Sequence, residues 1–350
     1  MPSYAKSLTV FTGSWLTVST IFLAGEIAYR YGAIAGIFTM LAFVVAFLLS
    51  IVFLRRDIAF ERTPFLFNVI QLLYLVRNSM ILFLILYFLA NVFQVHQINF
   101  TVISIVSSIV LYFLYRRWDE WGLSVRTANT VLIFSLAIFL PSYLYLQLGF
   151  ETVYHNLQHY YPRMLYTSLE GKWQVFLLLA LIFFLYFFSQ LNYVKLFVQS
   201  DFHRGLRKLL IGVLIIGMAL LSFSTMTIVA LTKDIQTDHI NEILLAVIQS
   251  QSPVMLSVII FLLIYIVTLI ELYISLAIFE TEALFPAKYK AKIMVITVIV
   301  GSLASYILIH LGIPISVLSL FIYYGIIIAL VTLLLLIVSL FKKSKNLKIK

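Results

Sequence analysis

The chain has 350 residues, of which 63% are hydrophobic and only 11% are charged. Soluble domains carry roughly 25% charged residues, so a chain with so few cannot cover an apolar core of this size in water. The composition therefore excludes a water-soluble globular protein. It predicts an integral membrane protein, with the lipid bilayer as a partner.

Apolar runs long enough to cross the roughly 30 Å hydrocarbon layer occur ten times along the chain. A segment inside lipid must satisfy its own backbone hydrogen bonds, so each run is predicted to be an α-helix. The first run has Lys6 before it and no small-residue cleavage site after it, which indicates a spanning helix rather than a signal peptide. The predicted spans are 8–29, 33–54, 65–93, 99–115, 128–148, 173–198, 209–231, 254–280, 293–310 and 314–341.

The positive charges predict the orientation of these helices, because short cytoplasmic loops are enriched in Lys and Arg. If the N-terminus is cytoplasmic, most of the 24 basic residues fall in cytoplasmic loops and tails, among them Arg55, Arg56 and the lysines of 342–350. Both termini are then predicted to be cytoplasmic in a plasma (cytoplasmic) membrane. The net charge of +10 follows from this topology and from anionic lipid, so no nucleic-acid partner is expected.

Two of the predicted outer connections are long, 149–172 and 232–253. The second contains an amphipathic segment, 240–248, and ends at Pro253. This segment is interpreted as a helix that lies either on the membrane surface, the favoured position, or as a lid over an outward-facing cavity.

Four stretches of the chain are similar to segments of one membrane-protein family. Residues 13–32 resemble its first core helix, which is broken and ends in a Tyr-Gly pair, here Tyr31-Gly32. Residues 122–127 resemble the cytoplasmic start of its fifth core helix. Residues 189–206 resemble its sixth core helix, and residues 244–281 resemble the loop and helix of its eighth. On these motifs the chain resembles the sodium/solute symporter family, which has the leucine-transporter fold of the APC superfamily.

The resemblance implies an all-α, polytopic membrane protein with ten transmembrane helices in a 5+5 inverted repeat. The chain is predicted to be a single integral membrane domain, 1–350, with repeat one at about 8–148 and repeat two at about 173–341. The resemblance also implies secondary transport, in which unwound helices bind ions and substrate near the bilayer midplane.

In that family a sodium ion lies between the first and eighth core helices, and the resemblance carries the site onto five positions. Backbone oxygens would come from Thr12 and Trp15, and further ligands from Ile264, Val267 and Thr268. The family has two adjacent hydroxyl residues where this chain has Val267 and Thr268, so one oxygen ligand is missing. The Thr268 hydroxyl can instead bond to its own helix. This departure argues against a Na+ site, and the coupling ion is left as Na+ or H+, with no other cofactor expected.

Two charged residues lie deep inside predicted spans, Arg77 in the third and Glu271 in the eighth. An arginine at that depth costs about 2.5–3.5 kcal/mol on insertion scales, so it requires a partner or water. We predict that Arg77 and Glu271 pair across a central cavity or that Glu271 carries a proton; a purely structural ion pair is the alternative. Glu26 and Arg30, four residues apart at the outer end of the first span, are predicted to pair.

Polar side chains near the two expected helix breaks are candidate substrate contacts. They are Ser14 in the first span and Ser189, Gln190 and Asn192 in the sixth. Hydrogen bonds between neighbouring helices are the alternative role for such residues.

The sequence contains no recognisable catalytic cluster, so the protein is not expected to be an enzyme. It has no cysteine, and His155 and His159 lack an obvious acidic third ligand for a metal. The leading hypothesis is therefore a secondary transporter of a small solute working by alternating access. The alternative is a transporter-derived sensor or membrane subunit of a complex, with an unidentified protein partner. A polar cavity bordered by Thr12, Arg77, Gln190 and Glu271 would favour transport.

Overall fold

A computed structural model describes most of the chain, and every regular element among the described residues is a helix. The described residues are 12–13, 15–54, 64–115, 119–160, 162, 172–189, 202–232, 239–251 and 253–347. The helices of the first part are α2 (Val18–Tyr31), α3 (Ala33–Leu54), α4 (Pro64–Val92), α5 (Gln97–Tyr115), α6 (Asp119–Leu148) and α7 (Phe150–Tyr160). Those of the second part are α9 (Lys172–Ser189), α11 (Phe202–Thr232), η1 (Ile240–Glu242), α12 (Ile243–Gln251), α13 (Val254–Glu282), α14 (Ala287–His310) and α15 (Val317–Leu347).

Within these ranges, seven helices are long and apolar enough to cross a membrane. They are α4, α5, α6, α11, α13, α14 and α15. Shorter apolar helices lie within α3 and α9 and across η1 and α12. The protein is therefore a polytopic, all-helical membrane protein, as its composition predicted. The full count of ten spans in two repeats stays a prediction.

Apolar side chains cover the outward faces of the peripheral helices. On α14, Ile296, Ile299, Val300, Leu303 and Ile307 are all exposed and recur every three or four residues along one face. A continuous apolar face of this kind is unfavourable in water and natural in lipid. The apolar exposed surface and the helix lengths both indicate that lipid surrounds these helices.

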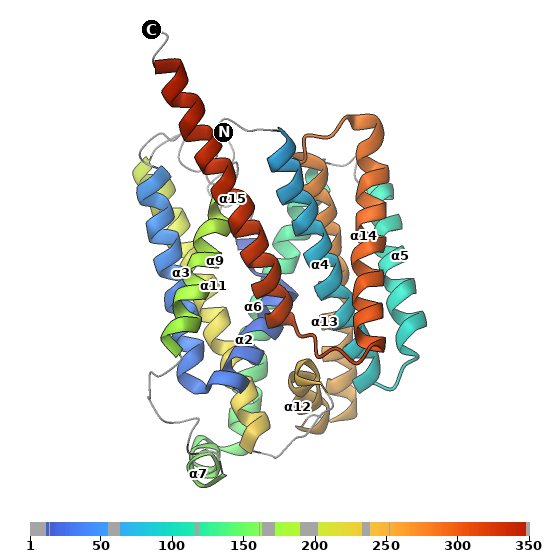
Figure 1. The fold of residues 1–350 in the computed structure, drawn as a ribbon. Coiled ribbons are helices and arrows are strands. Elements are labelled where there is room, and N and C mark those ends of the chain that lie inside the picture. The colour runs from blue at the N-terminus through green and yellow to red at the C-terminus, as the bar shows by residue number, and fades with distance from the viewer. Residues whose placement is uncertain are drawn as a thin grey trace.

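Eight of the described helices pack in two groups of four (Figure 1). In the first group, α3 packs on α9, and α11 packs on both α2 and α3. In the second group, α13 and α14 pack on α4, and α5 packs on α4 and α13. Helix α15 runs between the groups and contacts α4, α9 and α2, whereas α6 contacts α11 and α13.

Small residues bring neighbouring helices into close contact. A methyl group added to Gly36 of α3 would lie 2.6 Å from Cβ of Ser224 on α11. One added to Gly301 of α14 would lie 2.9 Å from the backbone oxygen of Val76 on α4. Helices inside membranes associate through such close approach, because lipid supplies no hydrophobic force between them.

The segment 240–248 is helical, as predicted, but its position differs from the favoured one. Helices η1 and α12 pack against α4 and α11, and the side chains of Ile243, Leu245 and Val247 are buried. A surface helix would leave its polar face in water, so the surface interpretation is wrong. That the segment is a lid over an outward-facing cavity stays a prediction. Helices α7 and α12, which belong to the two predicted outer connections, lie at the same end of the molecule (Figure 1).

Candidate functional site

The first span is interrupted in the middle of the helix bundle. Residues 12–13 and 15 are helical, and the turn closes with a 2.7 Å bond from the Leu16 amide to the Thr12 oxygen. Thr17 then adopts an extended conformation, with φ −124° and ψ 165°, and α2 begins at Val18. The interruption leaves the N-terminus of α2 inside the protein, where its first amides need partners outside the helix and its dipole supplies a partial positive charge.

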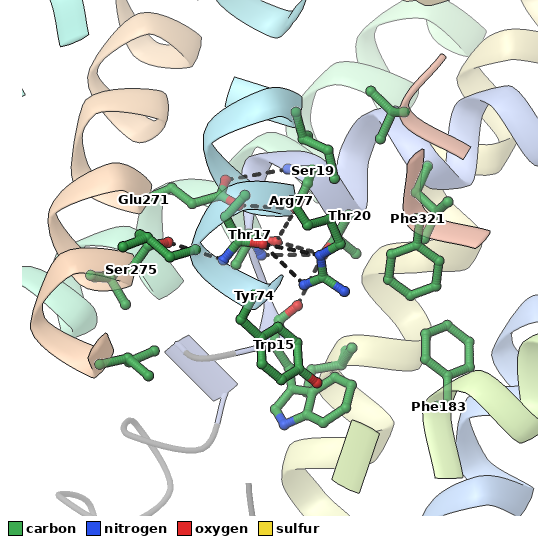
Figure 2. A pocket seen from close by; sticks show the side chains of 18 of the residues that line it. Trp15, Thr17, Ser19, Thr20, Tyr74, Arg77, Phe183, Glu271, Ser275 and Phe321 are labelled. Carbon is green, nitrogen blue, oxygen red and sulfur yellow. Dashed lines mark hydrogen bonds between the residues drawn. The ribbon is translucent and has the colours of Figure 1, made fainter. Parts of the chain in front are cut away.

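The carboxylate of Glu271, on α13, binds this helix N-terminus (Figure 2). It accepts hydrogen bonds from the amides of Val18 at 2.8 Å and Ser19 at 3.3 Å, and from the Ser19 hydroxyl at 2.9 Å. The side chain is buried, so these donors replace the water that would otherwise solvate its charge. An anion is favoured at a helix N-terminus by both the free amides and the helix dipole.

Arg77, on α4, is buried nearby in a largely aromatic setting. Its Nε and Nη2 donate to Oδ1 of Asn78 at 3.2 and 3.0 Å. The rings of Tyr74 and Phe321 lie 4.9 and 5.3 Å from its guanidinium carbon, within the range of cation–π attraction. The positive charge of Arg77 also attracts the Glu271 carboxylate. A direct contact between Arg77 and Glu271 stays a prediction.

A cavity of about 80 Å³ lies at the break, between the two groups of helices. Its polar lining residues are Thr17, Ser19, Thr20, Gln71, Asn78 and Ser275. Its charged ones, among the described residues, are Arg77 and Glu271. The rings of Trp15, Phe43, Phe183 and Phe321 form an aromatic wall, with successive centroids 5.2, 5.3 and 5.6 Å apart. The site therefore combines a polar, charged side with an aromatic side (Figure 2).

Three of the residues predicted from the sequence line this cavity: Trp15, Arg77 and Glu271. Thr12, Ile264, Val267 and Thr268 are buried but are not among the lining residues. Ser14, Gln190 and Asn192 lie outside the described residues, as does the side chain of Ser189 at the end of α9.

Sequence reasoning missed several polar residues of the cavity, although a signal for them exists. Gln71, Tyr74 and Asn78 are spaced i, i+3 and i+7, which places them on one face of α4. Ser275 follows Glu271 by four residues on α13, and its hydroxyl accepts a 3.2 Å bond from the Asn78 amide. A search at helical spacing around each embedded charge would have found Tyr74 and Ser275, and the spacing from Tyr74 then leads to Gln71 and Asn78.

The positions of the sodium site that the resemblance implies take part in hydrogen bonds within the protein. The Thr268 hydroxyl donates to the oxygen of Ile264 at 2.7 Å, as an ordinary bond within its own helix. The oxygen of Trp15 accepts a 2.9 Å bond from the Thr20 hydroxyl, and that of Thr12 accepts from the Leu16 amide. Val267 is buried and offers no oxygen. Each of these oxygens thus takes part in a hydrogen bond within the protein, and the choice between Na+ and H+ stays a prediction.

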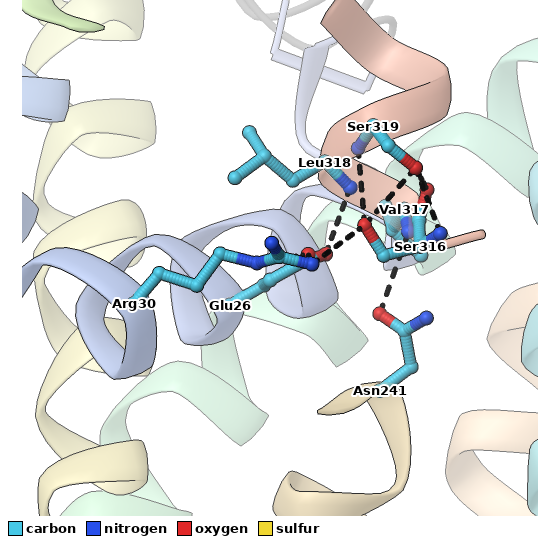
Figure 3. Close-up of polar contacts among 7 residues, drawn as sticks. All are labelled: Glu26, Arg30, Asn241, Ser316, Val317, Leu318 and Ser319. Carbon is cyan, nitrogen blue, oxygen red and sulfur yellow. Dashed lines mark hydrogen bonds and ion pairs between the residues drawn. The ribbon is translucent and has the colours of Figure 1, made fainter. Parts of the chain in front are cut away.

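A second carboxylate, Glu26, links α2 to α15 (Figure 3). It forms the predicted ion pair with Arg30, at 2.7 Å. The sequence did not predict its other bond, a 2.8 Å contact with the Leu318 amide at the start of α15. Arg30 also donates to the Ser316 hydroxyl at 3.3 Å, and Oδ1 of Asn241 in η1 accepts from the Val317 amide at 3.4 Å. This network, the α15 cap, joins α2, α15 and η1.

Comparisons with known proteins show a similarity of fold. No family model matches the chain, and no curated protein matches it either. A solved structure of a Na+-coupled sialic acid symporter, in its substrate-bound, outward-open state, is similar over 96% of both chains. The TM-score is 0.52 and the sequence identity is 12%, so the similarity is one of fold. The chain is accordingly a multi-pass membrane protein with a symporter-like, transporter-like fold.

Proposed function

We propose that this chain is a secondary active transporter that moves a small solute across the plasma membrane by alternating access. The observation that carries the proposal is the cavity at the break of the first span, where a helix N-terminus and two embedded charges meet. Transporters with broken helices bind substrates and ions at such breaks, because unwinding exposes backbone groups and helix dipoles inside the membrane. The symporter-like fold supports the same function.

The packing of the helices supports an inverted repeat of five spans. If α4 and α5 are the third and fourth spans of the first repeat, α13 and α14 are those of the second. Helix α13 packs on α5, and α14 packs on α4. Each third span thus contacts the fourth span of the other repeat, as a two-fold relationship requires. The two groups of helices would then move against each other and open the cavity to one side at a time.

We further propose that H+, rather than Na+, is the coupling ion, and that Glu271 carries it. The ionised carboxylate links α13, in one group, to α2, in the other, through three hydrogen bonds. The group that faces it with a charge is Arg77 of α4. Protonation removes the charge that the helix N-terminus attracts, so the link weakens and the groups become free to move. The engaged oxygens at the sodium-site positions support the choice of H+.

The test is uptake by liposomes that contain the purified protein. Labelled lactate, alanine, glucose and choline represent anionic, zwitterionic, neutral and cationic solutes. We expect an inward H+ gradient to drive accumulation of at least one of them, and an inward Na+ gradient at equal pH to have no such effect. In Glu271→Gln, exchange of the solute should persist while accumulation driven by H+ is lost. Glu151→Gln is the matched control, because that carboxylate is 90% exposed on α7.

The outcomes separate the alternatives. Accumulation driven by Na+ would overturn H+ coupling and leave transport standing. A folded protein that transports none of these solutes, and binds none of them, would favour the transporter-derived sensor or membrane subunit.

The predicted orientation has an independent test, because the chain contains no cysteine. Single cysteines introduced as Ser344→Cys, near the end of α15, and Asn156→Cys, on α7, report on the two sides of the membrane. With cytoplasmic termini, an impermeant thiol reagent added to intact cells should label the second variant only.

A further inference from the structure

One face of α14 combines apolar side chains with two lysines near the start of the helix. The apolar side chains, all exposed, are those of Ile296, Ile299, Leu303 and Ile307. Lys292 and Lys288 precede Ile296 by four and eight residues, and a helix places residues at this spacing on the same face. Both lysine side chains are exposed as well. We call this face, from Lys288 to Ile307, the α14 stripe.

The lysine between these two has a different environment. Lys290 is half-buried, and its Nζ donates a 2.7 Å hydrogen bond to the backbone oxygen of Glu280 on α13. Among the described residues, no carboxylate forms an ion pair with Lys288 or Lys292. The ammonium group of Lys288 lies 4.6 Å from the centre of the Tyr289 ring. The charges of Lys288 and Lys292 therefore face the surroundings of the protein rather than its interior.

The length of α14 sets the depth of the two lysines in the membrane. The chain has no charged side chain between Lys292 and His310. At 1.5 Å per residue these two residues are about 27 Å apart, which nearly matches the roughly 30 Å hydrocarbon layer. Lys292 thus lies at the edge of the hydrocarbon, and Lys288 lies about 6 Å further out, among the lipid headgroups. Tyr289, whose side chain is exposed, is an aromatic residue of the kind enriched at this level.

The position of this end of α14 indicates which lipids surround it. Helix α14 begins at the end of the molecule opposite α7 and α12 (Figure 1). Helices α7 and α12 belong to the predicted outer connections, so α14 begins at the predicted cytoplasmic end. The cytoplasmic leaflet carries the anionic phospholipids, which attract basic residues next to a span.

A phospholipid matches the whole stripe, whereas an acidic protein segment matches only part of it. An acidic segment could bind the two lysines, but it would leave the apolar side chains beside them to lipid. The phosphate of a phospholipid accepts charge-assisted hydrogen bonds from ammonium groups, and its acyl chains cover apolar side chains. One molecule can therefore satisfy both halves of the stripe.

We infer that the α14 stripe is a binding site for an anionic phospholipid, with the phosphate at Lys288 and Lys292 and an acyl chain along Ile296 and Leu303. The inference is independent of the proposed transport function, since the stripe lies outside the cavity lining. A lysine near an anionic membrane surface contributes about fivefold to binding, the equivalent of about 1 kcal/mol. A zwitterionic phospholipid compensates its own phosphate charge, so an anionic one should bind at least about five times more tightly here.

The experiment measures which lipid lies against the stripe. The chain contains no cysteine, so Ile296→Cys can carry a single bimane fluorophore, about 6 Å from Lys292 along the helix. The labelled protein is reconstituted into vesicles of phosphatidylglycerol and phosphatidylcholine, in which one lipid or the other has brominated acyl chains that quench bimane. The two quenching curves give the relative association constant of the two lipids. Ile307→Cys is the matched control, because it lies on the same face in the opposite leaflet, where α14 has no lysine.

We expect phosphatidylglycerol to be favoured at least about fivefold at Ile296→Cys and less than about twofold at Ile307→Cys. Lys288→Gln combined with Lys292→Gln should remove the preference at the first label. Arg207→Gln, which removes an exposed positive charge from α11, should leave that preference unchanged. If the double variant fails to fold, the comparison of the two labels decides the matter.

Equal association of the two lipids at Ile296→Cys would overturn the inference. An equal preference at both labels, or a preference that survives the loss of both lysines, would also overturn it, because anionic lipid would then gather without this site. Binding of polyglutamate that depends on Lys288 and Lys292, with no lipid preference, would assign the two lysines to an acidic protein instead.

Discussion

The bond between Glu26 and the start of α15 should contribute more to stability than the ion pair beside it. The Glu26 side chain is 1% exposed, and it accepts from the Leu318 amide, which is also buried. Glu26→Ala removes the acceptor and leaves that amide without a partner. Water cannot reach the amide to replace the lost bond, so the full desolvation penalty applies.

The magnitude follows from two contributions. A buried donor left without a partner costs about 1–3 kcal/mol. Loss of a negative charge at a helix N-terminus costs a further 0.3–1 kcal/mol or so. We therefore expect Glu26→Ala to lower the free energy of unfolding by about 1–4 kcal/mol. Glu26→Gln retains an oxygen for the Leu318 amide and should cost about 1 kcal/mol, the charge contribution alone.

Arg30→Gln probes the other side of the carboxylate. The Arg30 side chain is 42% exposed, so water can replace it on Glu26, and partly exposed ion pairs contribute about 0–1 kcal/mol. The assay is unfolding by SDS in mixed micelles, followed by tryptophan fluorescence. Glu151→Ala, which removes a 90% exposed carboxylate, is the matched control and should have no effect. A loss for Arg30→Gln equal to that for Glu26→Ala would refute the reasoning, because the ion pair would then be the main contribution.

Three further predictions use the same unfolding assay. Gly301→Ala should cost about 1–3 kcal/mol, because its methyl group meets the backbone of α4 at 2.9 Å, whereas Gly25→Ala, 3.4 Å from its nearest neighbour, should not destabilise. Thr268→Val should lower the free energy of unfolding by less than about 1 kcal/mol, because the hydroxyl bonds within its own helix. Replacing Na+ by N-methylglucamine should change the stability of neither the unaltered protein nor this variant. Asn91→Ala removes a 2.7 Å donor to buried Glu242, so it should cost about 1–3 kcal/mol and increase hydrogen exchange in η1.

The candidate site shows which of its features could be predicted from the sequence. The energetic cost of a charge inside lipid is local information, so Arg77 and Glu271 could be recognised without any structure. Their membership of one cavity followed from the family resemblance and agrees with the structure. The partner of Glu271 could not be predicted in this way, because Val18 and Ser19 lie more than 250 positions away and bind through backbone amides.

The α15 cap shows the same division. Spacing of four residues predicted the Glu26–Arg30 pair, because a helix places such residues side by side. The Leu318 amide became a partner only when α15 was packed against α2. Likewise, the amphipathic pattern at 240–248 predicted a helix. Tertiary contacts then decided that Ile243 and Val247 are buried against other helices, which the pattern did not predict.

The sequence by itself determined that this protein is embedded in a lipid bilayer and that its membrane-spanning segments are helices. Both conclusions rest on local physics: apolar length must match the hydrocarbon layer, and a backbone in lipid must bond to itself. Only the tertiary structure decided which side chains lie at each helix end, and therefore which charges the helix ends compensate. The α2 N-terminus binds Glu271 only because α2 and α13 pack together, and no property of either segment alone could determine that.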